Sequence, residues 1–447
     1  MSIKRSIFEE LILESNDQSK SIDISAGTVA LDYYEDIFSP VITAKLRVIN
    51  VGNTVKNEKT GEQQSIYNGL PLRGGERVAI KIAGNSSTNQ KAGGLDFSTK
   101  PSDYLYVSNI TDVISETNKE SFTLNLVSKE AFTNETIRVP IKFKPDQKIN
   151  ESVSKIIKDY LKTDKTGTIE ETSNRYGFIG NLRKPFTLLI WLASKAVPVS
   201  SSGKNSNAGF FFYQTRDGFQ FRSIDSLINK EKNPKKATYT YTQAKVNYDN
   251  DNNKIDNDFT ILNYFTTRNQ NLIEKLRMGT YASHRMFFNP LTFGFSDYNK
   301  GKFTINDYSG NDYLGSETLK LPKISNANNQ SLGESPSRLI TAVLDIGTMD
   351  QGVSTALNAN PELYQSQSLM RYNILFTQVL NMTIPLNLTL RAGDMIECLF
   401  PRVSTAETKE YDEAQSGLYI IKELCHHFDV ENSFTSLKLI RDTYGLK

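Results

Sequence analysis

Residue types that build most metal, redox and disulfide sites are scarce in this chain. Its 447 residues include 2 cysteines, 3 histidines and 1 tryptophan. Two cysteines cannot form the disulfide framework of a small secreted domain, so we expect Cys398 and Cys425 to be free thiols. The first residues, MSIKRSIFEE, have no apolar signal-peptide region. We therefore expect the protein to be made in the cytosol and to stay there.

An excess of charge and a long apolar run are also missing. The chain has 52 Lys and Arg against 50 Asp and Glu, so its net charge of +2 creates no strong field toward nucleic acid or an anionic membrane. The longest strongly apolar stretch, residues 186–197, is much shorter than the roughly 20 residues that span a bilayer. We expect neither specific nucleic-acid binding nor membrane insertion.

Side chains that could hold a metal do not converge in the sequence. His284, Cys425, His426 and His427 are the strongest candidates. Consecutive residues of a strand point to opposite faces, so His426 and His427 are poorly placed to share one ion. A structural place in a strand is the favoured interpretation for both histidines, and we expect no metal and no cofactor.

Acidic pairs and aromatic runs have ordinary interpretations as well. Asp249 with Asp251, and Asp307 with Asp312, lie in polar stretches, where a solvated loop is more frequent than a cation site. The run at residues 210–213 lacks the clustered Lys and Arg of a base-stacking surface, which predicts a buried hairpin face. No Gly-x-Ser-x-Gly elbow and no nucleotide-binding Gly-Lys-Ser/Thr loop occurs. We therefore do not expect an enzyme.

Apolar sequence is plentiful enough for several cores. Hydrophobic residues make up 38% of the chain and charged residues 23%, which is typical of a globular protein, and the length suggests about three domains. Alternation of polar and apolar residues predicts strands over most of the N-terminal third and again at residues 378–442. Helical spacing predicts helices at residues 150–162, from Pro185 onward and near residues 366–376. Between them, Asp217-Gly218 predicts a tight hairpin turn with positive φ.

A segment near the N-terminus returns near the C-terminus. Residues 70–80 (LPLRGGERVAI) match residues 388–398 (LTLRAGDMIEC), and both are predicted as strand, glycine turn and strand. Two further matches follow in the same order. The offsets are 318 residues from Arg73 to Arg391, 313 from Leu105 to Leu418, and 312 from Phe122 to Phe434. Coincidence between common β devices is the alternative, but the shared order and spacing favour two related β domains.

The repeated turns are the candidate site residues. They are Arg73, Gly74 and Gly75 in the first copy, and Arg391, Gly393 and Asp394 in the second. We expect a structural role for them. Replacing Gly75 or Gly393 with Val should destabilise its β domain, taken as a barrel, by about 1 kcal/mol or more, because such turns need positive φ. Two similar barrels per chain in a cyclic trimer would display six similar units.

In their order, these segments resemble the baseplate hub protein of contractile-tailed bacteriophages, which is related in fold to the base of type VI secretion spikes. The likeness covers nearly the whole chain, although each motif alone is a common β device. It is carried by residues 33–40 (YYEDIFSP), 72–76 (LRGGE), 211–225, 391–401, 416–421 and 439–442. Long polar loops at residues 52–65, 84–98 and 307–336 depart from a minimal hub.

The resemblance implies an α+β protein that is mainly β, with two related tube-type antiparallel β-barrel domains and α+β insertions. We place the first barrel at residues 1–145 and an α+β middle domain at residues 146–258. The second barrel is expected at residues 259–305 and 366–447, and a polar insertion at residues 306–365. Within this division, the loops at residues 52–65 and 84–98 should be exposed and mobile, and residues 230–258 should be an irregular connection with one or two strands.

The resemblance also implies a structural role. The expected protein is a homotrimer forming a pseudo-six-fold ring, with the hexameric tail tube on one face and the trimeric central spike or tail-lysozyme protein on the other. Baseplate wedge proteins would be further partners. The expected location is the virion tail baseplate, after assembly in the host cytoplasm. The alternative is a monomeric multi-domain β protein that binds carbohydrate or a cell surface through its long loops and tyrosines, and a hydrolase is the least favoured option.

Overall fold

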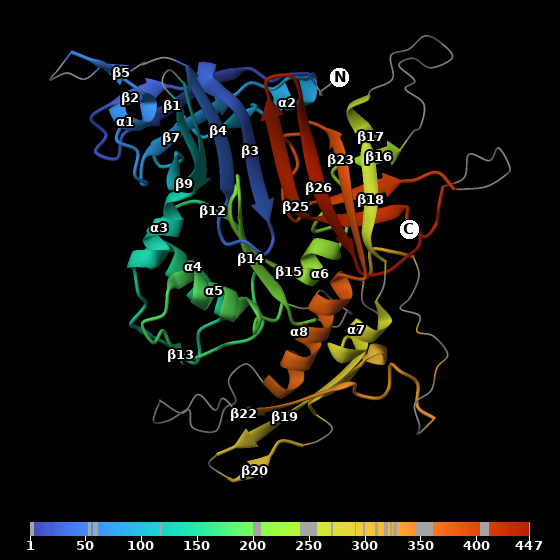
Figure 1. Cartoon of the computed structure of the whole chain (residues 1–447). Helices are drawn as coiled ribbons and strands as arrows, with labels where there is room; N and C mark the ends of the chain where they lie inside the picture. The colour runs from blue at the N-terminus through green and yellow to red at the C-terminus, as the bar shows by residue number, and fades with distance from the viewer. Residues whose placement is uncertain are drawn as a thin grey trace.

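The computed structural model describes residues 4–51, 55–56, 61–116, 119–199, 207–241, 257–269, 271–290, 292–297, 300–308, 312–316, 321, 324, 329–344, 361–402 and 411–446. Long strands from the two ends of the chain lie side by side in one part of the molecule, and helices with shorter strands form the other part (Figure 1). The fold is α+β and mainly β, as predicted. No helix in the described ranges is long and apolar enough to cross a membrane.

The N-terminal unit is a curled sheet in the order β3-β4-β10-β9-β7-β1-β2, with β8 beside β7. Its strands alternate as the sequence predicts: in β4, Ala44, Leu46 and Val48 are buried, whereas Lys45 and Arg47 are exposed. The elements are β1 (Phe8–Glu14), β2 (Ser21–Asp23), a 3₁₀ turn (Ser25–Gly27), β3 (Thr28–Asp36), β4 (Thr43–Val51), β5 (Val55–Lys56), β6 (Gln63–Gln64), α1 (Ile66–Gly69), β7 (Arg77–Ile82), α2 (Ser87–Lys91), β8 (Leu95–Asp96), β9 (Leu105–Glu116) and β10 (Lys119–Val127).

The C-terminal unit repeats this arrangement in the order β18-β23-β26-β25-β24-β16-β17. All its pairings are antiparallel except those of β16, which runs parallel to β24 and β17. The unit is thus mainly antiparallel, as expected, and β16 is its exception. The elements are β16 (Thr238–Tyr241), a 3₁₀ turn (Asn257–Phe259), β17 (Thr260–Ile261), β18 (Asn263–Asn269), β23 (Gln378–Pro385), β24 (Met395–Leu399), β25 (Gly417–Asp429) and β26 (Ser433–Arg441).

Along the chain, an α+β region separates the two units, and its helices match the predicted ones. The helix expected at residues 150–162 is α4 continued by a π-helical turn, and α5 begins at Pro185. The hairpin β14-β15 turns at Arg216 and Asp217, but only Gly218 has a positive φ, 107°. The elements are α3 (Lys129–Thr136), β11 (Lys142–Phe143), α4 (Ile149–Ile156), the π turn (Ile157–Leu161), β12 (Thr166–Ile169), β13 (Phe178–Ile179), α5 (Pro185–Ala193), β14 (Phe210–Thr215), β15 (Gly218–Ser223) and α6 (Ile224–Ile228).

A separate small sheet lies beyond the C-terminal unit, in the order β20-β19-β21 with β22 also beside β19. Packed against β19 is α8, which contains the helix predicted near residues 366–376. The elements are α7 (Leu272–Arg277), β19 (Ala282–Asn289), β20 (Gly294–Phe295), β21 (Lys302–Thr304), a 3₁₀ turn (Ile305–Tyr308), β22 (Arg338–Val343) and α8 (Pro361–Leu375).

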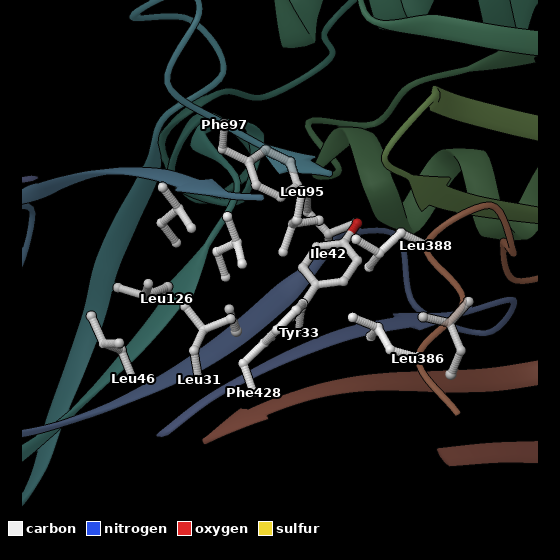
Figure 2. Close-up of a cluster of buried hydrophobic side chains, with 14 of the residues drawn as sticks. Leu31, Tyr33, Ile42, Leu46, Leu95, Phe97, Leu126, Leu386, Leu388 and Phe428 are labelled. Carbon is white, nitrogen blue, oxygen red and sulfur yellow. The ribbon is translucent and has the colours of Figure 1, made fainter. Parts of the chain in front are cut away.

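One continuous hydrophobic core serves both units. Figure 2 shows Leu386 and Leu388, which follow β23, gathered with Tyr33 and Phe97 of the N-terminal unit. Burial of this apolar surface is the main favourable contribution to folding. Because one core joins the units, they pack against each other and are not independent domains connected by a linker.

Several predicted segments lie elsewhere than expected. Residues 84–98 are not simply a mobile loop, since they contain α2 and β8 and bury Asn89 completely. Residues 238–241, expected in the middle domain, form β16 of the C-terminal sheet, whereas residues 282–304, expected in the second barrel, form the separate small sheet. The rest of the loop predictions at residues 52–65, 230–258 and 307–336 lies partly outside the described residues.

Candidate functional site

The turn of the N-terminal unit is held by one carboxylate. The Glu76 side chain accepts hydrogen bonds from the backbone N–H of Arg73 at 2.6 Å and of Gly74 at 2.9 Å. Gly74 and Gly75 have φ values of 102° and 89°, in the left-handed region that residues with a Cβ avoid. Asn16 donates to the Gly74 carbonyl at 2.8 Å. Arg73 is exposed, so this turn lies at the surface.

The turn of the C-terminal unit is also held by a carboxylate and contains a glycine with positive φ, but it is covered by other residues. The Asp394 carboxylate accepts a hydrogen bond from the backbone N–H of Arg391 at 2.9 Å, and Gly393 has a φ of 90°. A Cβ atom on Gly393 would lie 2.4 Å from the hydroxyl of Tyr213. Burial raises the pKa of the Asp394 carboxyl. This turn is therefore covered by the middle region of the chain.

Backbone hydrogen bonds show that the two turns are equivalent. The Gly75-Glu76 dipeptide exchanges two hydrogen bonds with Val107, of 2.8 and 2.9 Å. The Gly393-Asp394 dipeptide exchanges the same two with Ile421, also of 2.8 and 2.9 Å. In both units the next residue of the long strand is a β-bulge, and these bulged residues are Ser108 and Lys422. A shared bulge at a shared turn supports a duplication.

The hydrogen-bond register corrects the sequence comparison. Val107 corresponds to Ile421, so the offset along β9 and β25 is 314 residues at this point and Leu105 corresponds to Tyr419, not to Leu418. Along β10 and β26 the offset is 313 rather than 312. Residues 70–72 and 388–390 are not strands, so only the second half of the predicted strand, turn and strand pattern is present. Alternation of apolar and polar residues alone does not prevent an alignment error of one residue, because many residue types occur at the same strand position.

The two units are joined through their strands. The second half of β25 pairs antiparallel with β3, from Glu423 opposite Asp36 to Asp429 opposite Ala30. Figure 1 shows β25 lying directly beside β3. The result is one antiparallel sheet in the order β18-β23-β26-β25-β3-β4-β10-β9. We call the β25-β3 pairing the joint.

Two neighbouring histidines of β25 face opposite sides of the joint, as the sequence predicts for a strand. His427 contacts Asp32 of β3 through Nδ1 at 2.5 Å and Asp429 through Nε2 at 3.2 Å. The hydrogen bond to Asp32 raises the pKa of His427. His426 points into the core and stacks on Tyr33 with ring centroids 6.0 Å apart, and burial holds its pKa well below the usual value.

A buried carboxylate fastens the joint to the rest of the chain. Glu35 is 1% exposed and accepts hydrogen bonds from the Tyr33 hydroxyl at 2.8 Å, the Arg216 N–H at 2.8 Å and the Ala392 N–H at 2.9 Å. Burial raises the pKa of Glu35. Three parts of the fold, namely β3, the β14-β15 hairpin and the C-terminal turn, therefore meet at one side chain. Sequence reasoning missed Glu35, and the available signal was a carboxylate on the inward side of an alternating strand.

A second residue that sequence reasoning missed connects the two units, this time from the N-terminal unit to the C-terminal one. Asn89, in α2, donates to the Leu386 carbonyl at 2.8 Å and accepts from the Leu388 N–H at 2.8 Å. Its amide therefore substitutes for a strand partner of the C-terminal unit. The polar composition around residue 89 predicts a loop and conceals this contact.

The joint leaves two matching strand edges open. Beyond Val107, β9 pairs only with β10, and β18 pairs only with β23, as far as the described residues extend. In the repeat, β9 corresponds to β25 and β18 to β3. Through the ladder registers, Ile114 takes the place of His427 and Phe265 takes the place of Asp32. Ile114 is 58% exposed and Phe265 is 59% exposed, so both open edges present a large apolar side chain to solvent.

The remaining candidate residues do not converge on a chemical site. His284 lies in β19, in a different sheet from Cys425 and the other two histidines. Within the described ranges, no group of three or more His, Cys, Asp or Glu side chains is placed to hold a metal ion. Asp307 accepts hydrogen bonds from Thr304, and Asp312 accepts one from Asn229. Asp249 and Asp251 lie outside the described residues.

Two predictions about single residues are confirmed. Residues 210–213 are all buried, with exposed fractions of 1–3%; Phe210 and Phe212 belong to the core of the middle region, and Phe211 and Tyr213 to a core shared with the C-terminal unit. Cys398 and Cys425 are free thiols, and burial raises the pKa of Cys425 to about 12. Neither thiol is activated, because only the thiolate is a good nucleophile.

Comparison with known proteins supports the resemblance to baseplate hubs. No profile of a known protein family matches the chain. The chain is 25% identical, over 339 residues, to a probable baseplate hub protein of Vibrio phage KVP40, covering 72% of this chain and 71% of that protein.

Solved structures with a similar fold include the 43 kDa tail protein of prophage MuSo2 from Shewanella oneidensis, with a TM-score of 0.51, 10% identity and coverage of 97% of this chain and 99% of that one. A tail protein from Neisseria meningitidis MC58 gives a TM-score of 0.50 at 10% identity, with coverage of 97% and 96%. The resemblance is confirmed, and the fold is that of phage tail proteins.

Proposed function

We propose that this protein is the structural hub of a phage tail baseplate. In this role it is a non-enzymatic homotrimer whose six repeated units form a pseudo-six-fold ring. The ring joins the hexameric tail tube to the trimeric central spike. The observation that carries the proposal is the match between the joint inside the chain and the two open edges at its ends. Similarity to a probable baseplate hub protein supports the location in the virion.

Pairing of β9 in one copy with β18 in the next would repeat the joint between subunits. The two edges belong to corresponding strands, although β9 carries a second bulge between Thr111 and Ile114 that β25 lacks, so we align them at the ladder positions of the joint beyond that bulge. In that register Ile114 lies opposite Phe265. Both are large apolar side chains on open edges, and cross-strand contact would remove them from water. An open apolar edge is otherwise an aggregation hazard, which gives it a reason to be covered.

Such pairing is head to tail, because different edges of the two copies meet. A heterologous contact builds either a closed ring or an open filament, depending on the rotation between neighbours. Each copy contributes two units, so closure after three copies presents six units around the axis. A ring of this kind matches a hexameric tube on one face and keeps a three-fold axis for a trimeric spike on the other.

Disulfide cross-linking tests both the oligomer and its register. We expect Ile114→Cys together with Phe265→Cys to form intersubunit disulfides under mild oxidation, because facing residues of antiparallel strands meet the distance requirement. Non-reducing gels should show covalent dimers and trimers, and light scattering should give three times the chain mass at micromolar concentration. The matched control pairs Ile114→Cys with Asn263→Cys, which is two residues out of register and should cross-link far less.

A stable monomer would overturn the proposal, as would equal cross-linking of the two cysteine pairs. Glycan binding by such a monomer would favour a carbohydrate-binding or cell-surface role instead. The domain division, with residues 238–241 moved to the C-terminal sheet and residues 282–304 to the separate small sheet, belongs to the same proposal, as do the spike, tube and wedge contacts and assembly in the host cytoplasm. Electron micrographs of the purified protein should show a short ring with three-fold symmetry.

A further inference from the structure

A cavity far from the joint has the lining of an anion-binding site. It lies between the end of α5, β19 and α8, in the part of the molecule away from the long strands (Figure 1). Its volume is about 310 Å³, at the lower end of the range of ligand pockets. The residues that matter are one indole, two cations and their neighbours: Trp191, Lys195, Arg285, Gln365 and Tyr372. The proposed ring uses none of these residues.

Arg285 has an incomplete set of partners. Its Nη1 donates to the side-chain oxygen of Gln365, whereas its Nε is buried and has no hydrogen-bond partner among the described residues. Burial and the nearby Arg338 lower the pKa of Arg285. No carboxylate in the described ranges forms an ion pair with this guanidinium. Two neighbouring like charges are unfavourable, and an anion in the cavity would relieve their repulsion.

Two further cations lie near the indole of Trp191, and one of them, Lys195, lines the cavity. Lys195 Nζ lies 5.0 Å from the ring centroid of Trp191, and the Arg183 guanidinium lies 5.8 Å from it. The wall formed by Trp191, Leu369 and Tyr372 is largely apolar. Cations next to an apolar wall suit a carboxylate carried on a side chain better than a small inorganic ion, because both the charge and the carbon chain find a partner.

We propose that this cavity binds an acidic peptide segment of a partner protein, with a carboxylate on Arg285 and Lys195 and the adjoining side-chain carbons against Trp191. Arginine binds carboxylates in a planar, charge-assisted geometry, so the guanidinium that lines the cavity suits this ligand. The inference goes beyond the hub role and does not depend on the ring.

Trp191 reports on the cavity directly, because it is the single tryptophan of the chain. The experiment titrates the full-length protein with an acetylated hexaglutamate peptide and follows tryptophan fluorescence, with hexaglutamine as the uncharged control peptide. We expect a saturable change with hexaglutamate alone, and weaker binding as salt is added. Arg285→Gln should weaken the affinity by about tenfold, as expected for one lost charge-assisted hydrogen bond.

Two further variants keep the test decisive. Lys195→Gln, at a half-buried position, should also weaken binding and replaces Arg285→Gln if that variant does not fold. Arg47→Gln removes an exposed cation of β4, far from the cavity, and should leave the affinity unchanged. No saturable response to hexaglutamate, or equal affinity in the wild type and both cavity variants, would overturn the proposal. Because binding is read from the cavity itself, the result is separate from the oligomeric state.

Discussion

The two repeated units differ less in their folds than in what covers them. The C-terminal turn lies under the β14-β15 hairpin, and the C-terminal edge strand, β25, is covered by β3. The N-terminal turn is at the surface, and β9 is open. Equivalent surfaces of a duplicated unit thus have different neighbours. The pairing of β25 with β3 inside one chain is the contact that we propose for β9 with β18 between chains.

Side chains at the two kinds of edge also differ in chemistry. The joint has the polar pair His427 and Asp32, whereas the open edges have Ile114 and Phe265 at the corresponding places. A pairing within one chain is formed during folding and loses no freedom of separate molecules. A pairing between chains must offset the entropy of association, and apolar burial is the most general way to do so. The difference is therefore the one expected if β9 meets β18.

The largest effect should come from the carboxylate that connects the covered turn to the joint. Glu35→Ala leaves buried N–H and O–H donors without an acceptor and should lower the free energy of unfolding by about 3–5 kcal/mol. Glu35→Gln keeps one acceptor and should cost about 1–3 kcal/mol. Urea denaturation measures both. As a control, Glu423→Ala removes a half-exposed carboxylate of β25 and should cost less than about 1 kcal/mol. Equal losses for Ala variants at the two positions would refute the role of Glu35.

Alanine at the two turn glycines should separate the covered turn from the open one. Gly75 and Gly393 have nearly the same φ, 89° and 90°, so the strain of about 1–2 kcal/mol is common to both. A new Cβ meets the Tyr213 hydroxyl at 2.4 Å in Gly393→Ala, but only the exposed Asn16 side chain at 3.2 Å in Gly75→Ala. Overpacking should bring the Gly393→Ala loss to about 2–4 kcal/mol.

Thermal and urea unfolding of these two variants test that difference. Gly74→Ala is a control for strain alone, since its nearest contact would be 3.8 Å away. If Gly75→Ala were as costly as Gly393→Ala, the N-terminal turn would have to be covered as well. If that outcome occurred in an oligomeric form of the protein but not in a monomeric variant, a neighbouring subunit would be what covers the turn.

The smallest expected effect is a pH dependence confined to the joint. His427 lies between Asp32 and Asp429, and its pKa is raised in the folded protein. Its protonated form therefore stabilises the fold below the unfolded pKa of about 6.5, and this contribution is lost as the pH rises through the higher folded value. The stability difference between the wild type and His427→Asn should be larger at pH 5.5 than at pH 8.5, by less than about 1 kcal/mol. A difference independent of pH would contradict the His427–Asp32 pairing.

Sequence reasoning succeeded where structure depends on local patterns. The helix from Pro185 and the buried run at residues 210–213 were predictable because helical spacing and apolar runs act over a few residues. It failed where a contact is distant. Asn89 sits in a polar stretch typical of a loop, and only its contact with the segment after β23 makes it a buried lock. The same holds for β16, which the chain order assigns to the middle region and hydrogen bonding assigns to the C-terminal sheet.

Periodicity, turn glycines and a repeated order of segments in the amino-acid sequence determined that this protein is mainly β and carries two similar units. These features are local, and short-range sterics and the alternation of side chains translate them directly into strands and turns. Only the tertiary structure decided which edge of each unit is covered and which is open. The joint brings together residues as far apart as Asp32 and His427, 395 positions away, and no local preference encodes a pairing over that distance.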